Sequence, residues 1–361
     1  MDWRIFGRVV LSASLSLAVV CLDGCRGTAS TPSPDWEAAN PVQPLPTPPL
    51  GIQTGFEELA EPPTPERVRL GRWLFFDGRL SADGRVACAT CHEPEHGYSQ
   101  RTAVATGIRG QKGNRKAPSI LNQAWNVYPN FFWDGRADSL EAQALGPIAN
   151  PIEMGMTHDE MVAKVSAVKG YGPYFVQAFG SPDVTKERVV KAIADFERTQ
   201  MSGGSAWDVW RENRDEAAVS DAVKAGHALF HGRAGCNQCH LNQNLTDSRF
   251  HNVGIGWNPD TQKFLDDGRF TISKEPADLG AFKTPSLRDV AKRPPYMHDG
   301  SVPTLRAVVE HYNRGGIKNP YLSSKIVPLG LTDGEIDSLV AFLEALTGTT
   351  PLATAPTAFP Q

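Results

Sequence analysis

The chain has 361 residues with 36 Lys and Arg against 40 Asp and Glu, and its net charge of −4 gives no basic field for a nucleic-acid partner. A hydrophobic content of 40% is enough for globular cores and excludes a wholly disordered chain, while the length favours two domains over one. The six cysteines are the most informative count, because four of them form two close pairs.

The first 25 residues resemble an export signal. Arg4 and Arg8 precede an uncharged stretch from Val9 to Leu22, which is too short to span a bilayer. The sequence that ends at Cys25 is similar to a bacterial lipobox, which predicts that Cys25 is acylated and becomes the mature N-terminus; simple secretion is the alternative. Both outcomes predict a protein of the bacterial periplasm or cell envelope, anchored to a membrane by lipid in the first case.

Four segments are expected after the signal at residues 1–25. Residues 26–54 are rich in proline and lack hydrophobic periodicity, which predicts an extended linker. Residues 55–210 and 211–348 carry helical periodicity and predict two mostly α-helical domains with long loops. Residues 349–361 are polar and contain proline, which predicts a flexible tail that carries no chemistry.

Helix start signals recur through both predicted domains. Thr64 followed by Pro65 is typical of a helix N-terminus, since proline is favoured at the first helical position. Thr157 and Thr332 each have a glutamate three residues later, which is the spacing of a capping box. Long alternations of polar and apolar residues are absent, so a mostly α fold is predicted.

One short pattern occurs twice. A G-x-x-L-F sequence at Gly71–Phe75 precedes Cys88–His92, and the same sequence at Gly226–Phe230 precedes Cys236–His240. Each of the two later segments reads C-x-x-C-H. The chain is therefore expected to contain a duplicated unit, one copy in each domain.

The C-x-x-C-H motif is the signature of covalently attached c-type haem. Its two thiols add to the haem vinyl groups and its histidine is placed to ligate the iron. A redox disulfide or half of a zinc site are the alternatives, but neither explains a histidine directly after both pairs. Two covalent haem c groups are predicted, with these binding residues: Cys88, Cys91, His92, Cys236, Cys239 and His240.

Further motifs surround the two C-x-x-C-H sites. In chain order they are WDGRA at Trp133–Ala137, then Gln143, Pro147 and Glu153, then PYMHDG at Pro295–Gly300, and Tyr312. With these motifs the chain resembles the bacterial di-haem cytochrome c peroxidase/MauG family over about residues 55–347. The resemblance implies two cytochrome c-like domains, with a peroxidatic haem in the N-terminal domain and an electron-transfer haem in the C-terminal one.

The resemblance also implies roles for four side chains. Trp133 would relay electrons between the haems, and Gln143, Pro147 and Glu153 would line the distal pocket of the peroxidatic haem. Cleavage of bound peroxide needs a proton moved from the inner to the outer oxygen, which a carboxylate such as Glu153 can do. Gln143 can hydrogen-bond the oxygens, and Pro147 fills space without offering a ligand. The ordinary alternatives are a core aromatic for Trp133 and solvated helix positions for Gln143 and Glu153.

Two departures from the classical peroxidases indicate the MauG-like branch. Classical members carry a second histidine ligand in the loop after the first motif, but residues 107–113 contain no histidine, so an open sixth position is expected at the first haem. Tyr312 stands where classical members have a methionine, so the second iron is expected between His240 and Tyr312. A phenolate stabilises ferric iron and lowers the potential. A core role for Tyr312, and Met297 as the ligand, are the alternatives.

Members of this family also hold a calcium ion between the domains. The resemblance implies an asparagine side chain and backbone carbonyls as ligands, and the carbonyls would come from Arg293 and Pro295. Lys116 stands at the asparagine position, with Asn114 nearby, and a charged lysine would repel Ca²⁺. Calcium is left open, with Asn114, Arg293 and Pro295 as its candidate ligands.

These features together predict an enzyme. The leading hypothesis is a di-haem c-type peroxidase that reduces hydrogen peroxide at the N-terminal haem, with electrons relayed through the C-terminal haem from a small cytochrome c or cupredoxin. The first alternative is a MauG-type, peroxide-dependent oxidation of a specific protein or organic substrate. The second is a non-catalytic di-haem electron carrier, which would need both irons six-coordinate.

Overall fold

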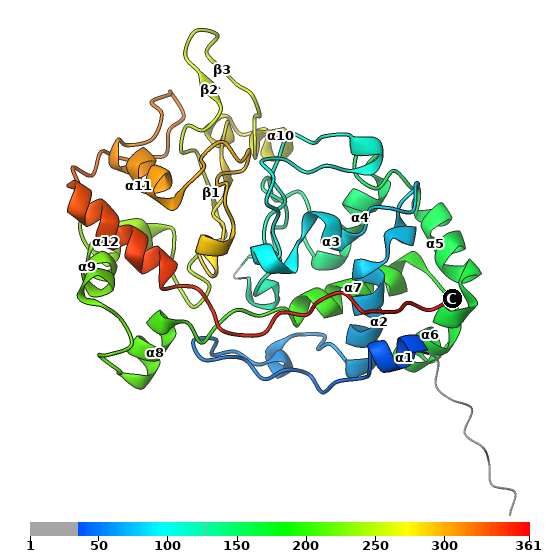
Figure 1. The fold of residues 1–361 in the computed structure, drawn as a ribbon. Helices are drawn as coiled ribbons and strands as arrows, with labels where there is room; N and C mark the ends of the chain where they lie inside the picture. The colour runs from blue at the N-terminus through cyan, green and yellow to red at the C-terminus, as the bar shows by residue number, and fades with distance from the viewer. Residues whose placement is uncertain (1–34, 127) are drawn as a thin grey trace, which may run out of the picture. The chain divides into compact units, whose positions relative to one another are not determined.

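Two packed helix pairs organise the fold, one in each half of the chain. In the N-terminal half α2 (Pro65–Phe76) packs on α7 (Lys186–Arg198), and in the C-terminal half α9 (Asp221–His231) packs on α12 (Asp333–Glu344) (Figure 1). The computed structural model describes residues 35–126 and 128–361. The expected export signal and Cys25 lie outside the described residues.

A glycine sets how closely each pair approaches. A Cβ atom on Gly71 of α2 would lie 1.8 Å from the carbonyl oxygen of Ala192, and one on Gly226 of α9 would lie 2.0 Å from that of Ser338. Both distances are far below van der Waals contact, so only glycine allows the helices to touch there. The glycine of each G-x-x-L-F sequence is therefore needed for packing.

The remaining elements are short. The predicted mostly α-helical class is confirmed. The described residues contain four two-residue strands in two antiparallel pairs, β1 (Phe250–His251) with β4 (Phe282–Lys283) and β2 (Trp257–Asn258) with β3 (Lys263–Phe264). The other α-helices are α1 (Asp35–Ala39), α3 (Cys88–Cys91), α4 (Leu140–Ala149), α5 (His158–Ala167), α6 (Gly172–Phe179), α8 (Ala206–Asn213), α10 (Phe270–Ser273) and α11 (Leu305–Asn313).

The predicted helix starts are confirmed. The Thr64 side chain accepts a hydrogen bond from the backbone N–H of Arg67 at the start of α2. Thr157 and Thr332 form capping boxes with the glutamates three residues later, at the starts of α5 and α12. These caps satisfy N–H groups that have no partner inside a helix.

Each half has its own hydrophobic core. The first contains Trp73, Phe75 and Phe196, and the second contains Phe230 and Phe342. The predicted boundary after residue 210 falls inside α8, whose Trp207 is buried in the second core. Helix α8 therefore packs with the C-terminal half.

The proline-rich segment runs along the protein surface and contacts both halves. Near its start, the Trp36 indole donates to the Tyr174 hydroxyl (3.1 Å). Further on, the N–H of Gln53 donates to the side chain of Gln243 (2.7 Å). The part of the expected linker that the structure describes is thus bound to the folded body.

The C-terminal segment also packs against the body, where a flexible tail was expected. It crosses from α12 to the N-terminal half, as the red trace in Figure 1 shows. The Tyr98 hydroxyl donates to the carbonyl of Ala353 (2.6 Å), and the Trp73 indole to that of Ala358 (3.1 Å). These bonds tie the end of the chain to the first core, which its composition alone did not indicate.

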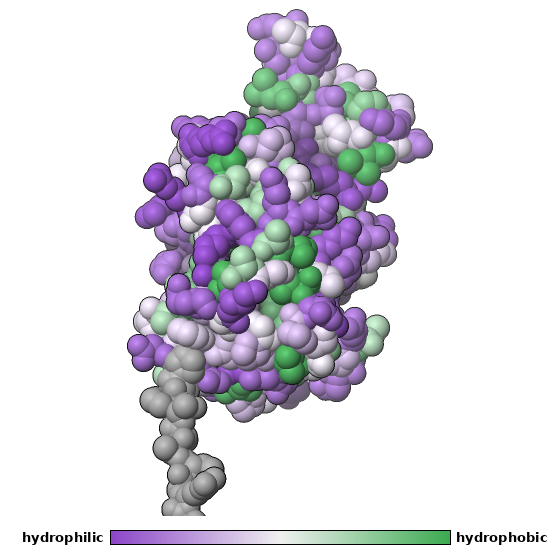
Figure 2. Space-filling model, turned by 90° about the vertical axis from the view of Figure 1, so that its right-hand side faces the viewer, coloured by the Kyte–Doolittle hydropathy of each residue, from purple (hydrophilic) through white to green (hydrophobic). Residues whose placement is uncertain are grey.

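The molecular surface is mostly polar on the face drawn in Figure 2, where hydrophobic side chains form separate patches. Within residues 35–126 and 128–361, no helix has the length and apolar character needed to cross a membrane.

Candidate functional site

The first C-x-x-C-H motif begins with α3 and ends with His92 as the residue that caps this helix. The Nδ1 atom of His92 lies 3.1 Å from the carbonyl oxygen of Tyr98. This contact fixes the ring and leaves Nε2 available as a metal ligand. Burial lowers the pKa of His92, so the ring is neutral and able to coordinate a metal.

The second motif repeats this arrangement. His240 follows a short 3₁₀ turn at Cys236–Gln238, and its Nδ1 atom lies 2.9 Å from the carbonyl oxygen of Leu245. Burial also lowers the pKa of His240. The ring of Phe230 lies 6.5 Å from that of His240, the same spacing as between Phe75 and His92. His240 lines a cavity of about 350 Å³, which does not include Cys236, Cys239 or Tyr312 in its lining.

The four thiols are free in the structure and disfavour the alternatives to haem attachment. Burial raises the pKa of Cys91 to about 11 and that of Cys236 to about 12. A redox-active C-x-x-C pair needs a lowered thiol pKa instead. The two pairs also pack in different cores, with Cys88 against the first and Cys236 against the second, so they do not form one four-cysteine zinc site.

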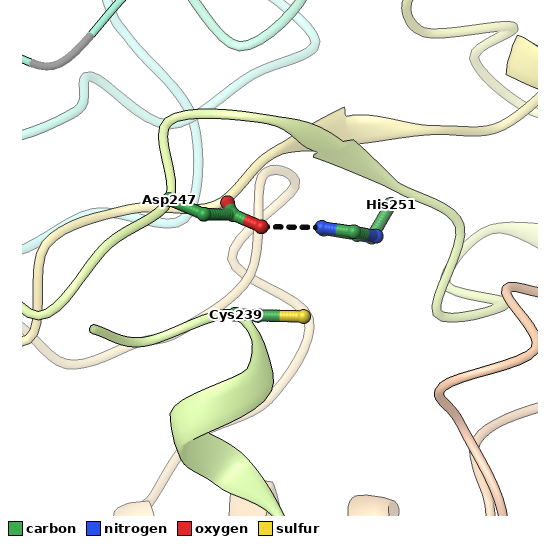
Figure 3. A group of neighbouring side chains, drawn as sticks. All are labelled: Cys239, Asp247 and His251. Carbon is green, nitrogen blue, oxygen red and sulfur yellow. Dashed lines mark hydrogen bonds and ion pairs between the residues drawn. The ribbon is translucent and has the colours of Figure 1, made fainter.

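A small cluster beside the second motif could also attract a metal. Ligand atoms of Cys239, Asp247 and His251 lie within 4.8 Å of one another, and Figure 3 shows the carboxylate and the imidazole facing each other. The hydrogen bond to Asp247 (2.8 Å) raises the pKa of His251 to about 9. Since this histidine is already paired and Cys239 belongs to the C-x-x-C-H motif, the cluster is part of the surroundings of the second haem site.

One cavity of about 380 Å³ gathers the residues that the sequence singled out in the N-terminal half. A haem bound there would meet two free thiols, a neutral histidine and the carboxyl group of Glu197, one oxygen of which has no hydrogen-bond partner among the described residues. The chemistry of the lining therefore fits the group. The cavity brings together Cys88, Cys91, His92, Trp133, Gln143, Pro147 and Glu153.

Glu153 is the carboxylate of this cavity that the sequence predicted. Burial raises its pKa above the usual value, although Arg136 and a hydrogen bond from Asn150 act in the opposite direction. Its charge acts on the Cys91 thiol, which places the carboxylate beside the haem-attachment motif. A carboxyl group with a raised pKa is suited to exchange protons near neutral pH.

The loop at residues 107–113 packs against the Glu153 segment. The N–H of Ile108 donates to the carbonyl of Glu153 (2.8 Å), and the Gln111 side chain donates to that of Pro151 (3.3 Å). A Cβ atom on Gly107 would lie 2.5 Å from the Cα of Glu153. This loop, in which classical members carry the second histidine ligand, thus packs closely against the carboxylate segment.

Trp133 lies where the two halves meet. Its indole N–H donates to the carbonyl of Lys116 (2.7 Å), and its own carbonyl accepts from the backbone N–H of Lys283 in the other half (2.8 Å). Besides lining the N-terminal cavity, Trp133 lines a small space of about 70 Å³ together with Lys283 and His92. The side chain is thereby fixed between the first site and the C-terminal half.

The backbone reveals a longer repeat than the sequence did. The turns at Gly135 and Gly300 have φ of 68° and 66°, and each is closed by an antiparallel bridge, Phe131 with Ala137 and Tyr296 with Val302. Each turn leads through a capping hydroxyl, Ser139 or Thr304, into one helix, α4 or α11. The two helices are therefore equivalent elements of the two halves.

This repeat relates Pro147 to Tyr312. The two residues lie at the same spacing after Gly135 and Gly300, Pro147 within α4 and Tyr312 within α11. Burial and the neighbouring thiols of Cys236 and Cys239 raise the pKa of Tyr312, which places its hydroxyl beside the second motif. The same position therefore carries a side chain with a ligand atom in one half and one without in the other.

The candidate calcium ligands do not fit that ion. The side chain of Asn114 is exposed and donates to Asp266 (3.2 Å). Lys116 holds an ammonium group in the buried region, and burial, together with the charge of the buried Arg293, lowers its pKa to about 8. A divalent cation there would lie close to the positive charges of Lys116 and Arg293, and none of its candidate ligands is a carboxylate.

Sequence reasoning missed one buried acid of the N-terminal cavity. Glu197 on α7 is 3% exposed, one of its carboxylate oxygens has no hydrogen-bond partner among the described residues, and burial raises its pKa to about 8. The signal was present in the sequence, because Val189, Ile193 and Glu197 recur at every fourth position of one helix face. A carboxyl group on an apolar face is rarely left without a function.

Comparisons with known proteins show the family of this chain. The family model described as "Di-haem cytochrome c peroxidase" matches residues 65–216. The chain is 46% identical over 288 residues to the methylamine utilization protein MauG of Methylorubrum extorquens, which covers 80% of each chain. It is 35% identical over 315 residues to the cytochrome c551 peroxidase of Nitrosomonas europaea, which covers 87% of this chain and 86% of that one.

A solved structure gives the same result. The crystal structure of a MauG-like protein associated with microbial copper homeostasis has a TM-score of 0.75 and 32% identity, over 89% of this chain and 98% of that chain. Family members of this kind are oxidoreductases that use peroxide and bind two c-type haems. The chain described here belongs to the di-haem cytochrome c peroxidase/MauG family.

Proposed function

We propose that the protein is a di-haem c-type peroxidase of the MauG-like branch, which reduces hydrogen peroxide in the N-terminal half with electrons supplied through the C-terminal half. One observation carries the proposal: the carboxyl group of Glu153, the amide of Gln143 and the ring of Pro147 line the same cavity as the first C-x-x-C-H motif. An acid–base group, a neutral hydrogen-bonding group and a position without a ligand are what reduction of peroxide requires there.

The haems would be held by the two C-x-x-C-H motifs. Cys88 and Cys91 would form thioether bonds in the first half, and Cys236 and Cys239 in the second. His92 would be the protein ligand of the first iron, and His240 with Tyr312 the ligands of the second. When bound, the haem supplies the redox-active iron at which peroxide accepts electrons.

Glu153 would move the proton. Its raised pKa lets the carboxylate take a proton from the inner oxygen of peroxide and return it to the outer oxygen, which leaves as water. Gln143 lines the same cavity and can hydrogen-bond either oxygen without itself titrating. Pro147 offers no donor atom, which keeps the distal side free for peroxide.

Trp133 would couple the two halves. Its indole and its main chain are bonded to Lys116 and Lys283, so the ring keeps one orientation between them. A small cytochrome c or cupredoxin would supply electrons to the second haem. We place this contact near the second cavity, which the exposed Arg211 lines together with His240.

A second function is supported by Tyr312. A phenolate favours oxidised iron, so the pair of haems would be able to oxidise a specific protein or organic substrate with peroxide. The MauG relative is named for methylamine utilization. The electron-carrier alternative needs a ligand on both sides of both irons, and Pro147 and the loop at residues 107–113 provide none in the first half.

Spectra of the fully oxidised holoprotein test these functions. EPR and absorption spectra should show one high-spin and one low-spin haem, and stoichiometric peroxide should change them rapidly without added electron donor. Two low-spin haems that do not respond to peroxide would contradict the proposal and favour the electron carrier. A reduced small cytochrome or cupredoxin is then added with peroxide. Its rapid oxidation indicates that it is the electron donor, whereas no oxidation favours another substrate.

The Tyr312→Met variant tests the second ligand. A thioether should raise the reduction potential of the second haem, within the range of about 0.8 V that axial ligands span, because it favours ferrous iron. Potentiometric titration measures the shift, with Tyr296→Phe as a control that removes a tyrosine of the adjacent turn. An unchanged potential would remove Tyr312 as a ligand.

We also propose export through residues 1–25, with Cys25 as an acylated N-terminus that attaches the enzyme to a membrane. Arg4 and Arg8, followed by the uncharged stretch from Val9 to Leu22, support this signal. Mass spectrometry of the mature N-terminus and a Cys25→Ser variant distinguish the lipid anchor from simple secretion.

A further inference from the structure

A buried ammonium group lies at the contact between the two halves. Lys116 is 5% exposed, and its Nζ atom donates to the carbonyl oxygens of Gln100 and Thr102. Among the described residues, no carboxylate lies within 4.0 Å of this nitrogen. Backbone carbonyls are therefore its direct hydrogen-bond partners, and the negative charge of Glu93 acts on it from a greater distance. Carbonyl oxygens are also groups that proteins use to bind a metal cation.

The main chain of Lys116 joins the two halves at the same place. Its N–H donates to the carbonyl of His298, in the turn of the C-terminal half (2.7 Å), and its carbonyl accepts from the Trp133 indole (2.7 Å). The carbonyl of Gln100 is thus linked through one lysine residue to the tryptophan and to the turn at Gly300.

The internal repeat places a second lysine at the equivalent position. Lys283 and Lys116 each lie two residues before a proline and a serine, and each N–H donates to the residue before the Asp-Gly turn of the other half. The Nζ atom of Lys283 also donates to a backbone carbonyl, that of Asn130 (2.5 Å). Both halves therefore present a lysine to the interface, and the two crossed backbone bonds follow one pattern.

We propose that the Lys116 ammonium is the resident cation of this interface and takes the place of a metal ion. The backbone carbonyls of Arg293 and Pro295 remain as possible calcium ligands, but the side-chain ligand is missing: Lys116 stands at its position, and Asn114 is bonded to Asp266. The Arg293 side chain adds a further positive charge. The ammonium group holds the Gln100–Thr102 segment, and the backbone of the same residue fixes Trp133. Lys116 is thus a positioning residue for the side chain that lies between the halves.

Metal content and thermal unfolding of the holoprotein test the proposal. The protein purified from buffer with millimolar calcium should contain far less than one calcium per chain by elemental analysis. Its Tm should be the same in calcium and in EGTA. One tightly bound calcium per chain, with a Tm that falls in EGTA, would overturn the proposal.

Variants test the role of the charge. Lys116→Met keeps the length of the side chain but removes the charge, and should lower the Tm and alter the EPR signal of the first haem, while Lys112→Met, at an exposed lysine of the same loop, should change neither. Lys116→Asn supplies an oxygen ligand in place of the ammonium. It should have a lowered Tm in EGTA that added calcium restores.

Each result decides between the two interpretations. Calcium rescue of Lys116→Asn shows that a cation is needed at this position, which a purely steric role of the lysine side chain would not produce. A Lys116→Met variant with unchanged Tm and EPR signal refutes the role of the charge. If Lys116→Met does not fold, the calcium content of the unaltered protein and the response of Lys116→Asn still decide the question.

Discussion

The two halves of this protein share one scaffold and differ at one ligand position. In each half a glycine brings two helices together, a phenylalanine lies 6.5 Å from the motif histidine, and a backbone carbonyl fixes the histidine Nδ1 atom. After the Asp-Gly turn, however, the N-terminal half has Pro147 where the C-terminal half has Tyr312. We therefore expect the duplicated scaffold to provide an accessible site in the N-terminal half and a site closed by Tyr312 in the C-terminal half, because only the tyrosine offers a donor atom at this position.

The difference extends to the groups around that position. The N-terminal cavity adds Gln143, Glu153 and Glu197, which bring a hydrogen-bonding amide and two acids to the site. At the position equivalent to Gln143, the C-terminal half has Val308, which offers neither. We therefore expect the proton transfer to peroxide in the N-terminal half, where Glu153 and Glu197 line the same cavity as the first C-x-x-C-H motif.

Conversion of Pro147 into tyrosine should remove this difference between the two halves. A Pro147→Tyr variant would present a phenol where Tyr312 lies in the other half and close the first iron. If the iron is then open in about 1% of molecules, the peroxide reaction slows about 100-fold. Stopped-flow absorption and EPR measure the rate and the loss of the high-spin signal.

Pro147→Ala is the control for this variant, since it removes the ring without offering a ligand and should keep the peroxide reaction. A Pro147→Tyr variant that stays high-spin and reacts at the original rate would show that the two positions are not equivalent. The assignment of the accessible site to the N-terminal half would then need another basis.

Glu153→Gln should slow the peroxide reaction about 10²- to 10⁴-fold, the usual contribution of a general acid–base group. Burial raises the pKa of Glu153, and only the deprotonated form can accept a proton from peroxide. The rate should therefore fall as the pH is lowered through a pKa above 4.5, and the variant should lack this acid limb. The pH profile of peroxide consumption measures both effects.

The exposed Glu95, close to the first motif, gives the matched control Glu95→Gln, which should keep the wild-type profile. Haem content should be unchanged in both variants. An acid limb that persists in Glu153→Gln would assign the proton transfer to another group.

Gly71→Ala and Gly226→Ala test the shared scaffold and should have similar effects. A methyl group would meet the carbonyl oxygen of Ala192 in one half and of Ser338 in the other, so the helices must separate. Overpacking of this kind costs about 1–3 kcal/mol of unfolding free energy. Thermal unfolding of the holoproteins compares them with Gly334→Ala in α12, where a methyl group meets nothing within 4 Å.

Much of the site could be predicted from the sequence, because haem attachment and helix capping depend on short local patterns. The C-x-x-C-H motifs and the starts of α2, α5 and α12 are of this kind. The packing of the proline-rich segment and of the tail could not be predicted, since it depends on hydrogen bonds to residues far away in the chain. Such segments lack the hydrophobic periodicity from which burial can be predicted.

The equivalence of Pro147 and Tyr312 also needed the backbone. The turns before them share only Asp-Gly in sequence, and the spacing between G-x-x-L-F and C-x-x-C-H differs between the halves. The positive φ angles and the antiparallel bridges are retained where the side chains have diverged. Backbone geometry therefore preserves a repeat that residue identity no longer shows.

Glu197→Gln should have the smallest effect, a change in how the Tm depends on pH. It tests the buried acid on α7 that lines the N-terminal cavity. Burial raises the pKa of Glu197 from 4.5 to about 8, so the folded protein retains a proton that the unfolded chain releases. The resulting contribution to stability is complete below pH 4.5 and is lost as the pH rises through 8. A glutamine cannot lose a proton, so the Tm of the variant should depend less on pH in this range. Glu187→Gln, at an exposed position of the same helix, should keep the wild-type dependence, and an equal slope in Glu197→Gln would mean that Glu197 is already ionised at neutral pH.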